Sequence, residues 1–555
     1  MRVILKERLT SIINEIAVNL LGNDKGDIEI PFTLVIPENV EHGDFACNVA
    51  MQLTRHLKRS PKVIAEEVIS LLNDKMGSEV SCQIAGPGFI NITISREWFE
   101  DTVIDIIDNP LYFHNNYGEK RKAVVEFVSA NPTGPLHIGH GRGAAYGDAL
   151  ARVLSMSGYN VHREYYVNDA GNQMNNLALS VYVRACEITH TQTDISFPEG
   201  GYKGDYIKDI AKNLLSKEPD LLNRDKKEAL ELCLEAAVKD ISSCIENDLL
   251  NFRVEFHNWF SEKSLYKNGS IIETLKELEK SGKTYEKDGA LWLNTSSMGD
   301  DKDRVLRKST GEYTYFTPDI AYHQDKYKRG FSFLIDIWGA DHHGYIKRME
   351  CALEALGYEK ESFKASLVQM VNLIQNGEKI SMSTRSGEFI PLSWLIDEVG
   401  VDAARFFYNM RSHDAQFDFD IDLAKSKSND NPVYYIQYAH ARVHSLLANA
   451  KDKGIEYIKG KGLNEALGSS EVQIIKSMIR LKYTIELAAI HLEPHRISYH
   501  LQELASMFHS YYYSNKILDV ENINLSCGRL TICHAVAVTI KKGLEILGVS
   551  APERM

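Results

Sequence analysis

Two histidines and three glycines lie close together in the segment Pro135-Leu136-His137-Ile138-Gly139-His140-Gly141-Arg142-Gly143. His137 and His140 can donate hydrogen bonds to phosphoryl oxygens, and glycines allow a ligand to approach the backbone closely. Such donors, with partly protonated imidazoles, would stabilise charge on an α-phosphate as pyrophosphate leaves. A carboxylate nucleophile would need no general base. The alternative, a glycine-rich turn with two surface histidines, is disfavoured because both histidines occur together at this place.

The elements around this segment place it at the edge of a parallel sheet. Residues 123–128 are rich in β-branched side chains and predict a strand, 143–156 predict a helix, and 161–167 predict a second strand. This order is a βαβ unit, in which phosphate binds at the helix N-terminus beside the carboxyl end of the first strand. Three further segments complete the domain, namely strands at 333–338 and 366–371 and a helical insertion at 205–250.

The two flanking regions have different patterns. Residues 1–112 combine predicted helices with an alternating strand at 89–94, which indicates an α+β domain. Near the C-terminus one helix face is marked by regularly spaced apolar residues and ended by Pro494. We therefore predict an α/β fold with four parts: an N-terminal domain (1–112), a parallel-sheet domain (113–400, insertion near 175–265), a connecting element (401–423) and an all-α domain (424–555).

The composition excludes several classes of protein. The chain has 555 residues, of which 44% are apolar and 25% charged, and a net charge of −13, so it is neither disordered throughout nor a general polyanion binder. Its 8 cysteines form no C-x-x-C pair, which indicates reduced thiols and argues against a zinc site. No run approaches the ~18 apolar residues of a membrane helix. We expect a cytoplasmic protein with no signal peptide and no membrane partner.

The sequence resembles class I aminoacyl-tRNA synthetases, whose H-I-G-H signature matches residues 137–140. The surrounding residues look like the arginyl-tRNA synthetase version, and the likeness extends through five more motifs: Asn168-Asp169-Ala170-Gly171-Asn172-Gln173, Trp338-Gly339-Ala340-Asp341-His342-His343-Gly344-Tyr345, Asp402-Ala403-Ala404-Arg405-Phe406, Asn431-Pro432-Val433-Tyr434-Tyr435-Ile436-Gln437-Tyr438 and Ala551-Pro552-Glu553-Arg554-Met555. The resemblance implies a Rossmann-type catalytic domain and a helical anticodon-binding domain. It also implies a monomer that activates L-arginine with ATP and transfers it to tRNA(Arg).

The resemblance also implies an arginine pocket. It falls on Glu126, Ser129 and Asn131 after the first strand, on Tyr315 and Asp319, and on Asp341, where many relatives carry Gln. A guanidinium presents a planar fork of donors that suits carboxylates, so we expect Asp319 and Tyr315 to bind it. Glu126 and Asn131 would then hold the α-ammonium and α-carboxylate. The alternatives are a solvent-facing Glu126 and an Asp319 that caps a helix beginning at Ile320.

The nucleotide site is implied in the same way. Gly339 and His342 would contact the nucleotide, and Mg²⁺ would arrive on the ATP phosphates, with no structural metal. The second class I signature, K-M-S-K-S, falls on Ser381-Met382-Ser383-Thr384-Arg385, where both lysines are missing. Met382 and Ser383 would still contact ATP. We expect Arg385, or else Lys379, to supply the cation for pyrophosphate, unless both are ordinary loop charges.

Contacts with tRNA are expected at both ends of the chain. Arg55 and Lys58 lie in a short basic stretch that could meet phosphates or simply end a solvated helix. Tyr435, Tyr438 and Arg442 offer stacking faces and donors for unpaired bases, although tyrosines at this spacing could also pack in a core.

Three rivals remain at this point. They are a small-molecule nucleotidyltransferase of the same superfamily, a non-catalytic paralogue that only binds tRNA or a protein, and another class I synthetase. The missing lysines are the best support for the second of these, whereas the intact His137, His140, Tyr315 and Asp319 argue against it. By the same resemblance, arginine activation itself can require bound tRNA.

Overall fold

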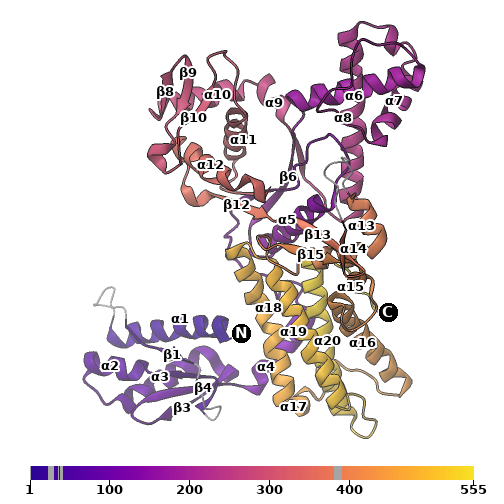
Figure 1. Ribbon diagram of the computed structural model, residues 1–555. Coiled ribbons are helices and arrows are strands. Elements are labelled where there is room, and N and C mark those ends of the chain that lie inside the picture. The colour runs from indigo at the N-terminus through magenta and orange to yellow at the C-terminus, as the bar shows by residue number, and fades with distance from the viewer. Residues whose placement is uncertain (1, 23–29, 36, 38–41, 381–389) are drawn as a thin grey trace.

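The computed structural model describes residues 2–22, 30–35, 37, 42–380 and 390–555. Its N-terminal domain combines helices α1 (Arg2–Leu21), α2 (Val49–Leu57) and α3 (Pro61–Met76) with a four-stranded sheet. The strand order is β1-β2-β4-β3, made by Leu34–Val35, Phe45–Cys47, Phe89–Ile94 and Val80–Ala85. Helix α4 (Arg96–Asp108) leads from it into the rest of the chain (Figure 1). The predicted α+β character of this domain is confirmed.

The central domain is built on a five-stranded parallel sheet of order β12-β11-β5-β6-β7. These strands are Phe363–Val368, Phe333–Gly339, Lys122–Glu126, Asn160–Val167 and Asn258–Ser261. Ala123, Val124 and Val125 are fully buried, as expected for a strand that is covered on both faces. The strand order reverses beside β5, and ligands bind at that edge of an open parallel sheet.

Two of the predicted boundaries were wrong. The strand expected at 366–371 is two elements, because β12 ends at Val368 and β13 (Val371–Gln375) joins a separate sheet with β14 (Glu378–Ile380) and β15 (Phe417–Asp420). The helix expected from Gly143 begins earlier, since α5 spans Ile138–Met156 and includes Gly139 and Gly141 as well. Gly141 serves close packing, since a Cβ there would lie 2.5 Å from the Leu392 side chain, whereas a Cβ on Gly143 would meet nothing within 4 Å.

Two insertions rise from the sheet as separate lobes (Figure 1). The first is helical, as predicted, with α6 (Asn172–Thr189), α7 (Asp205–Lys217) and α8 (Lys226–Asn251). The second was not predicted. It contains α9 (Glu262–Lys267), α10 (Ser270–Lys280) and the antiparallel strands β8 (Thr284–Lys287), β9 (Ala290–Leu293) and β10 (Arg304–Arg307). Helices α11 (Phe316–Lys328) and α12 (His343–Ala355) return the chain to the sheet.

The C-terminal domain is helical, as predicted, and is reached through α13 (Leu392–Val399), α14 (Val401–Tyr408) and α15 (Ile421–Lys425). It consists of α16 (Pro432–Asp452), α17 (Leu463–Ala466), α18 (Ser469–His491), α19 (His495–Ser514) and α20 (Ile523–Leu547). Helix α20 is long and apolar enough to cross a membrane, but 67% of that stretch is buried inside the protein. It is therefore the core helix of this domain.

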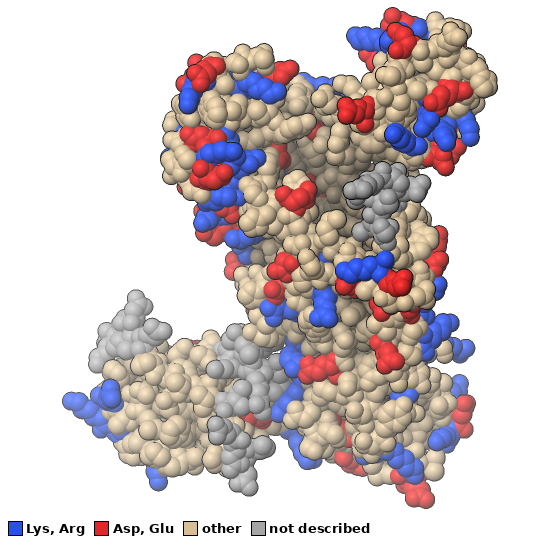
Figure 2. All heavy atoms as spheres, viewed as in Figure 1, with Lys and Arg blue, Asp and Glu red and all other residues tan. Residues whose placement is uncertain are grey.

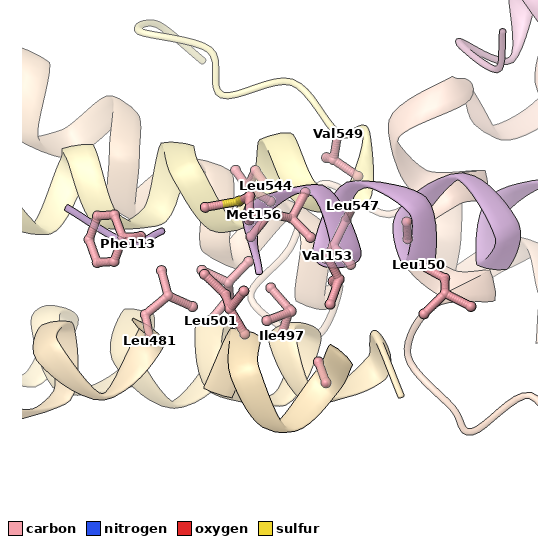
Figure 3. Close-up of a cluster of buried hydrophobic side chains, with 14 of the residues drawn as sticks. Phe113, Leu150, Val153, Met156, Leu481, Ile497, Leu501, Leu544, Leu547 and Val549 are labelled. Atoms are coloured by element: carbon pink, nitrogen blue, oxygen red, sulfur yellow. The ribbon is translucent and has the colours of Figure 1, made fainter. Parts of the chain in front are cut away.

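Helix α5 joins the parallel-sheet domain to the helical domain. Leu150, Val153 and Met156 lie in one cluster with Leu481 of α18, Leu501 of α19 and Leu544 of α20 (Figure 3). Beside it, the buried Arg405 of α14 binds Asp148 of α5 and donates to the carbonyl oxygens of Leu547 (2.9 Å) and Phe252 (2.8 Å). One guanidinium thus connects α5 with the C-terminal ends of α8 and α20.

Candidate active site

A cavity of about 930 Å³ lies at the carboxyl ends of β5 and β11. It is lined by eleven of the residues singled out in the sequence, namely Glu126, Ser129, Asn131, His137, Gly139, His140, Tyr315, Asp319, Gly339, Asp341 and His342. These come from separate segments of the chain, and the parallel sheet brings them to one edge. Their individual roles stay predictions.

The two histidines form the N-terminal cap of α5. His137 Nδ1 accepts from the N–H groups of Gly139 (3.1 Å) and His140 (3.3 Å), and His140 Nδ1 accepts from the His137 N–H (3.2 Å). Because each Nδ1 is an acceptor, the neutral rings carry their protons on Nε2. The rings are stacked, with centroids 3.6 Å apart.

Burial changes the expected charge of this pair. It lowers the pKa of His137 below its ordinary value, and it lowers the pKa of His140 to about 3. The expectation of partly protonated imidazoles is therefore wrong for this state of the protein. Both rings are neutral donors at pH 7, and the α5 N-terminus adds its dipole to them.

Glu126 is buried, with 6% of its surface exposed, so the solvent-facing alternative is wrong. Its carboxylate accepts from Lys326 Nζ (2.6 Å) and from the Ser129 hydroxyl (3.0 Å). The backbone turns sharply to allow this, since Val128 (φ 66°) and Ser129 (φ 40°) are both left-handed. Such a conformation is costly for residues other than glycine, and it occurs mainly where function requires it.

Asp319 lies in the first turn of α11, which begins at Phe316, so the alternative of an N-cap is wrong. Burial and the neighbouring Asp319 carboxylate raise the pKa of Tyr345 well above its ordinary value. Tyr315 occupies the N-cap position and is 81% exposed at the mouth of the cavity. Asp341 is exposed beside His342, with Asp341 Oδ2 3.8 Å from His342 Nε2.

A fourth acidic residue at the cavity, Glu262, was not predicted. It is the first residue of α9, just after β7, and only 7% of its surface is exposed. The Tyr266 hydroxyl donates to its carboxylate (3.5 Å), and burial together with the nearby Asp169 and Asp319 raises its pKa. Its position after a strand was the signal in the sequence, but β7 has only 4 residues.

The lining residues have one sign of charge. Glu126, Glu262, Asp319 and Asp341 are all among them, whereas no lysine or arginine is found among the described residues that line the cavity. Within the described part of the chain, no three His, Cys, Asp or Glu side chains are grouped to hold a metal ion. The cavity is thus suited to a ligand that carries its own positive charges.

The candidates for the missing lysines lie away from these residues. Lys379 of β14 is not among the lining residues, and its Nζ lies 3.5 Å from Asp418 Oδ1. Met382, Ser383 and Arg385 lie outside the described residues. Gln369, Met370 and Val371 do line the cavity, and Val371 precedes position 381 by ten residues in the sequence.

The proposed tRNA-binding residues of the helical domain form an aromatic cluster. Arg442 donates to the hydroxyl groups of Tyr438 (2.8 Å) and Tyr513 (3.3 Å), and its guanidinium lies over the rings of Tyr438, Tyr512 and Tyr513. Tyr435 packs on His509, with centroids 4.4 Å apart. Tyr512 and Tyr513 come from α19 and were not predicted.

The basic residues of the N-terminal domain lie at the end of α2. Arg55 belongs to its last turn and Lys58 is its C-cap, and both are exposed. The domain is held against the helical domain by Asp44, which lies 2.8 Å from Lys476 of α18. On the face shown in Figure 2, basic and acidic side chains are interspersed, so any basic surface there is local.

A parallel sheet with paired histidines at a helix N-terminus, an acidic cavity beside them and a helical domain behind defines a class I aminoacyl-tRNA synthetase. The family model described as "tRNA synthetases class I (R), catalytic domain" matches residues 102–417. The models "Arginyl tRNA synthetase N terminal domain" and "DALR anticodon binding domain" match residues 4–94 and 436–555. The chain belongs to the arginyl-tRNA synthetase family.

Individual relatives are similar to this chain over nearly all of its length. The chain is 47% identical over 524 residues to the arginine–tRNA ligase 1 of Halalkalibacterium halodurans, covering 94% of each. It is 44% identical over 553 residues to the arginine–tRNA ligase of Listeria monocytogenes, covering 99% of this chain and 98% of the relative. The arginyl-tRNA synthetase structure of Thermus thermophilus shares the fold, with a TM-score of 0.71, 21% identity and coverage of 99% and 100%.

Proposed function

We propose that this enzyme joins L-arginine to tRNA(Arg) in two steps. Arginine and ATP form arginyl-adenylate and pyrophosphate, and the arginyl group then passes to the 2′-OH of the 3′-terminal adenosine of the tRNA, with release of AMP. The observation that carries the proposal is the pair Glu262 and Asp319. Both carboxylates line one cavity that has no lysine or arginine among its described lining residues, and each lies beside a tyrosine, Tyr266 for Glu262 and Tyr345 for Asp319.

The arginine side chain fits these two carboxylates. A guanidinium presents parallel N–H donors and is always charged, so two adjacent carboxylates can bind it at several points. Glu126 and Asn131, at the end of β5, would hold the α-ammonium and the α-carboxylate. This places the reacting carboxylate near His137 and His140.

The first step needs stabilisation of charge rather than a base. The arginine carboxylate attacks the α-phosphorus, the bond from that phosphorus to the bridging oxygen breaks, and pyrophosphate leaves with the electron pair. Nε2–H donors on His137 and His140 and the N–H groups of the α5 N-terminus would stabilise the α-phosphate oxygens. Mg²⁺ would enter bound to the triphosphate. Gly339 and His342 would contact the ribose.

The tRNA would contact the two outer domains. The Arg442–tyrosine cluster offers stacking faces for unpaired anticodon bases, and Arg55 and Lys58 offer cations for phosphates. We propose that the enzyme works as a cytoplasmic monomer. The free thiols support this location, because all 8 cysteines of the sequence are unpaired and 6 of them are buried.

We propose that Arg385 neutralises the leaving pyrophosphate in place of the missing lysines, and that Lys379 does not. Lys379 pairs with Asp418 and does not line the cavity. Replacing Arg385 by Ala should slow adenylate formation by about 100-fold, with a smaller effect on the KM for ATP. The Lys379→Ala variant is the control and should keep its rate within about twofold, as for an exposed ion pair. Pre-steady-state adenylate formation distinguishes them, and the reverse order would reject this assignment.

The overall activity is tested by ATP–pyrophosphate exchange with each proteinogenic amino acid, with and without tRNA. Exchange with arginine alone, appearing on addition of tRNA, would support both the substrate and the tRNA dependence. Exchange with arginine in the absence of tRNA would remove the dependence only. Silence in every condition from protein that still binds tRNA would favour a non-catalytic paralogue.

A further inference from the structure

A continuous chain of charged groups lies beneath the cavity. Asp336 of β11 is fully buried, and its two oxygens accept from Lys326 Nζ (2.7 Å) and from His323 Nε2 (2.6 Å). Lys326 also donates to Glu126 (2.6 Å). His323 also contacts Asp319, since its Nδ1 lies 2.8 Å from the backbone oxygen and 3.4 Å from the carboxylate. Asp336 therefore connects two carboxylates of the cavity without lining it.

The geometry makes His323 an imidazolium. Its Nδ1 faces a carbonyl oxygen and its Nε2 faces a carboxylate, and neither partner can donate when Asp336 is ionised. Both ring nitrogens must then carry a hydrogen. The neighbouring Asp336 raises the pKa of His323 to about 10, and Lys326 and His323 lower the pKa of Asp336 to about 2.

With every carboxyl ionised, this group of side chains has one positive charge too few, because Glu126, Asp336 and Asp319 would supply three negative charges and Lys326 and His323 two positive ones. Burial together with the nearby Asp336 raises the pKa of Glu126 accordingly. Buried ionic groups cost free energy and stabilise a fold less than apolar packing would. The excess negative charge faces the cavity, where a cationic substrate would balance it.

We propose that Asp336 is a positioning residue which, through Lys326 and His323, fixes the carboxylates of Glu126 and Asp319 at the two ends of the arginine pocket. The proposal rests on the assignment of these two carboxylates to arginine made above. Lys326 holds the end that receives the α-ammonium, and His323 holds the end that receives the guanidinium. Because Lys326 and His323 both bind Asp336, that one carboxylate fixes the positions of Glu126 and Asp319 relative to each other.

The test uses the full-length enzyme with Asp336→Asn. The KM for arginine should rise by about 10- to 100-fold, the range seen when partners behind a ligand-binding group are lost, while the KM for ATP changes by less than about twofold. Glu164→Gln is the matched control. Glu164 is Glu126's partner on β6, is fully buried, is bound by Arg329 with two contacts of 2.6 Å, and does not line the cavity. It should destabilise the domain without selectively raising the KM for arginine.

Two further variants and an arginine analogue separate the ends of the pocket. δ-Guanidinovaleric acid is arginine without the α-ammonium. It keeps the guanidinium and the carboxylate, so its inhibition constant lacks only the contact of the ammonium with Glu126. His323→Gln should weaken both arginine and the analogue, whereas Lys326→Met should weaken arginine and leave the analogue within about twofold. These variants also serve if Asp336→Asn does not fold, and equal effects of both on the analogue would overturn the proposal.

Substitutions of the pocket residues Glu126 and Asp319 themselves distinguish a failure of this proposal from a failure of their assignment to arginine. If Glu126→Gln and Asp319→Asn raise the KM for arginine and Asp336→Asn does not, the positioning role is wrong and the pocket stands. If none of the three changes it, the assignment of the pocket is wrong and the positioning role falls with it. If Asp336→Asn raises the KM values for arginine and ATP equally, its role is structural only, and the proposal is overturned.

Discussion

Replacing Glu262 by Gln is expected to lower kcat/KM for arginine by about 30- to 1,000-fold, which corresponds to about 2–4 kcal/mol. Gln keeps the size of the side chain and can still accept from Tyr266, but it removes the charge that would pair with the guanidinium. The guanidinium would then lie in a buried site without its negatively charged partner, so the affinity for arginine should fall. Steady-state aminoacylation at varied arginine measures this, with most of the loss in KM.

Glu279→Gln is the control for this experiment. Glu279 lies on α10 of the same insertion, is exposed and does not line the cavity, so its replacement should change kcat/KM by less than about twofold. The KM for ATP should stay unchanged in both variants. An unaltered KM for arginine in Glu262→Gln would place the guanidinium elsewhere in the cavity.

Replacing Arg405 by Met is expected to lower the free energy of unfolding by about 3–5 kcal/mol, because it leaves the buried Asp148 without its innermost cation. The carbonyl oxygens of Leu547 and Phe252 would lose their donor as well. Urea denaturation followed by circular dichroism measures the shift of the first transition. Cleavage by a protease should accelerate in parallel, because the ends of α8 and α20 are released.

Arg152→Met is the matched control for Arg405. Arg152 also binds Asp148, with Nε 2.8 Å from Oδ2, but its side chain is 36% exposed. An ion pair with that exposure contributes about 1 kcal/mol or less. Equal destabilisation by the two variants would show that burial does not set the strength of these contacts.

The sequence predicted the architecture better than it predicted the partners within the site. Apolar runs such as Phe333–Gly339 predict strands well, because a strand covered on both faces is mostly apolar, even though this one includes the buried Asp336. Thr284–Lys287 was missed because most of it is exposed and its residues carry no alternating pattern. Glu262 was missed for a similar reason, since it follows a strand of half-buried residues.

Other features could not have been read from the sequence. Lys326 and His323 are polar residues in a helix, and periodicity assigns such residues to a solvated face. Their burial depends on how α11 packs on β11, which sets His323 and Lys326 against Asp336. Asp319 was predicted from the family resemblance. The row of charged residues behind it, His323, Asp336 and Lys326, could be recognised only from contacts in the folded protein. The same holds for Tyr512 and Tyr513, which reach Arg442 from another helix.

The apolar cluster around α5 bears on how this enzyme could be divided. The N-terminal turn of helix α5 lies at the nucleotide end of the cavity. Leu150, Val153 and Met156, further along the same helix, belong to the core shared with α18, α19 and α20 (Figure 3). A fragment ending before α16 would expose that side of α5 to water and should aggregate rather than act as a minimal enzyme. Two fragments expressed together should reassemble through the same cluster, so the domains are separable in sequence but not in folding.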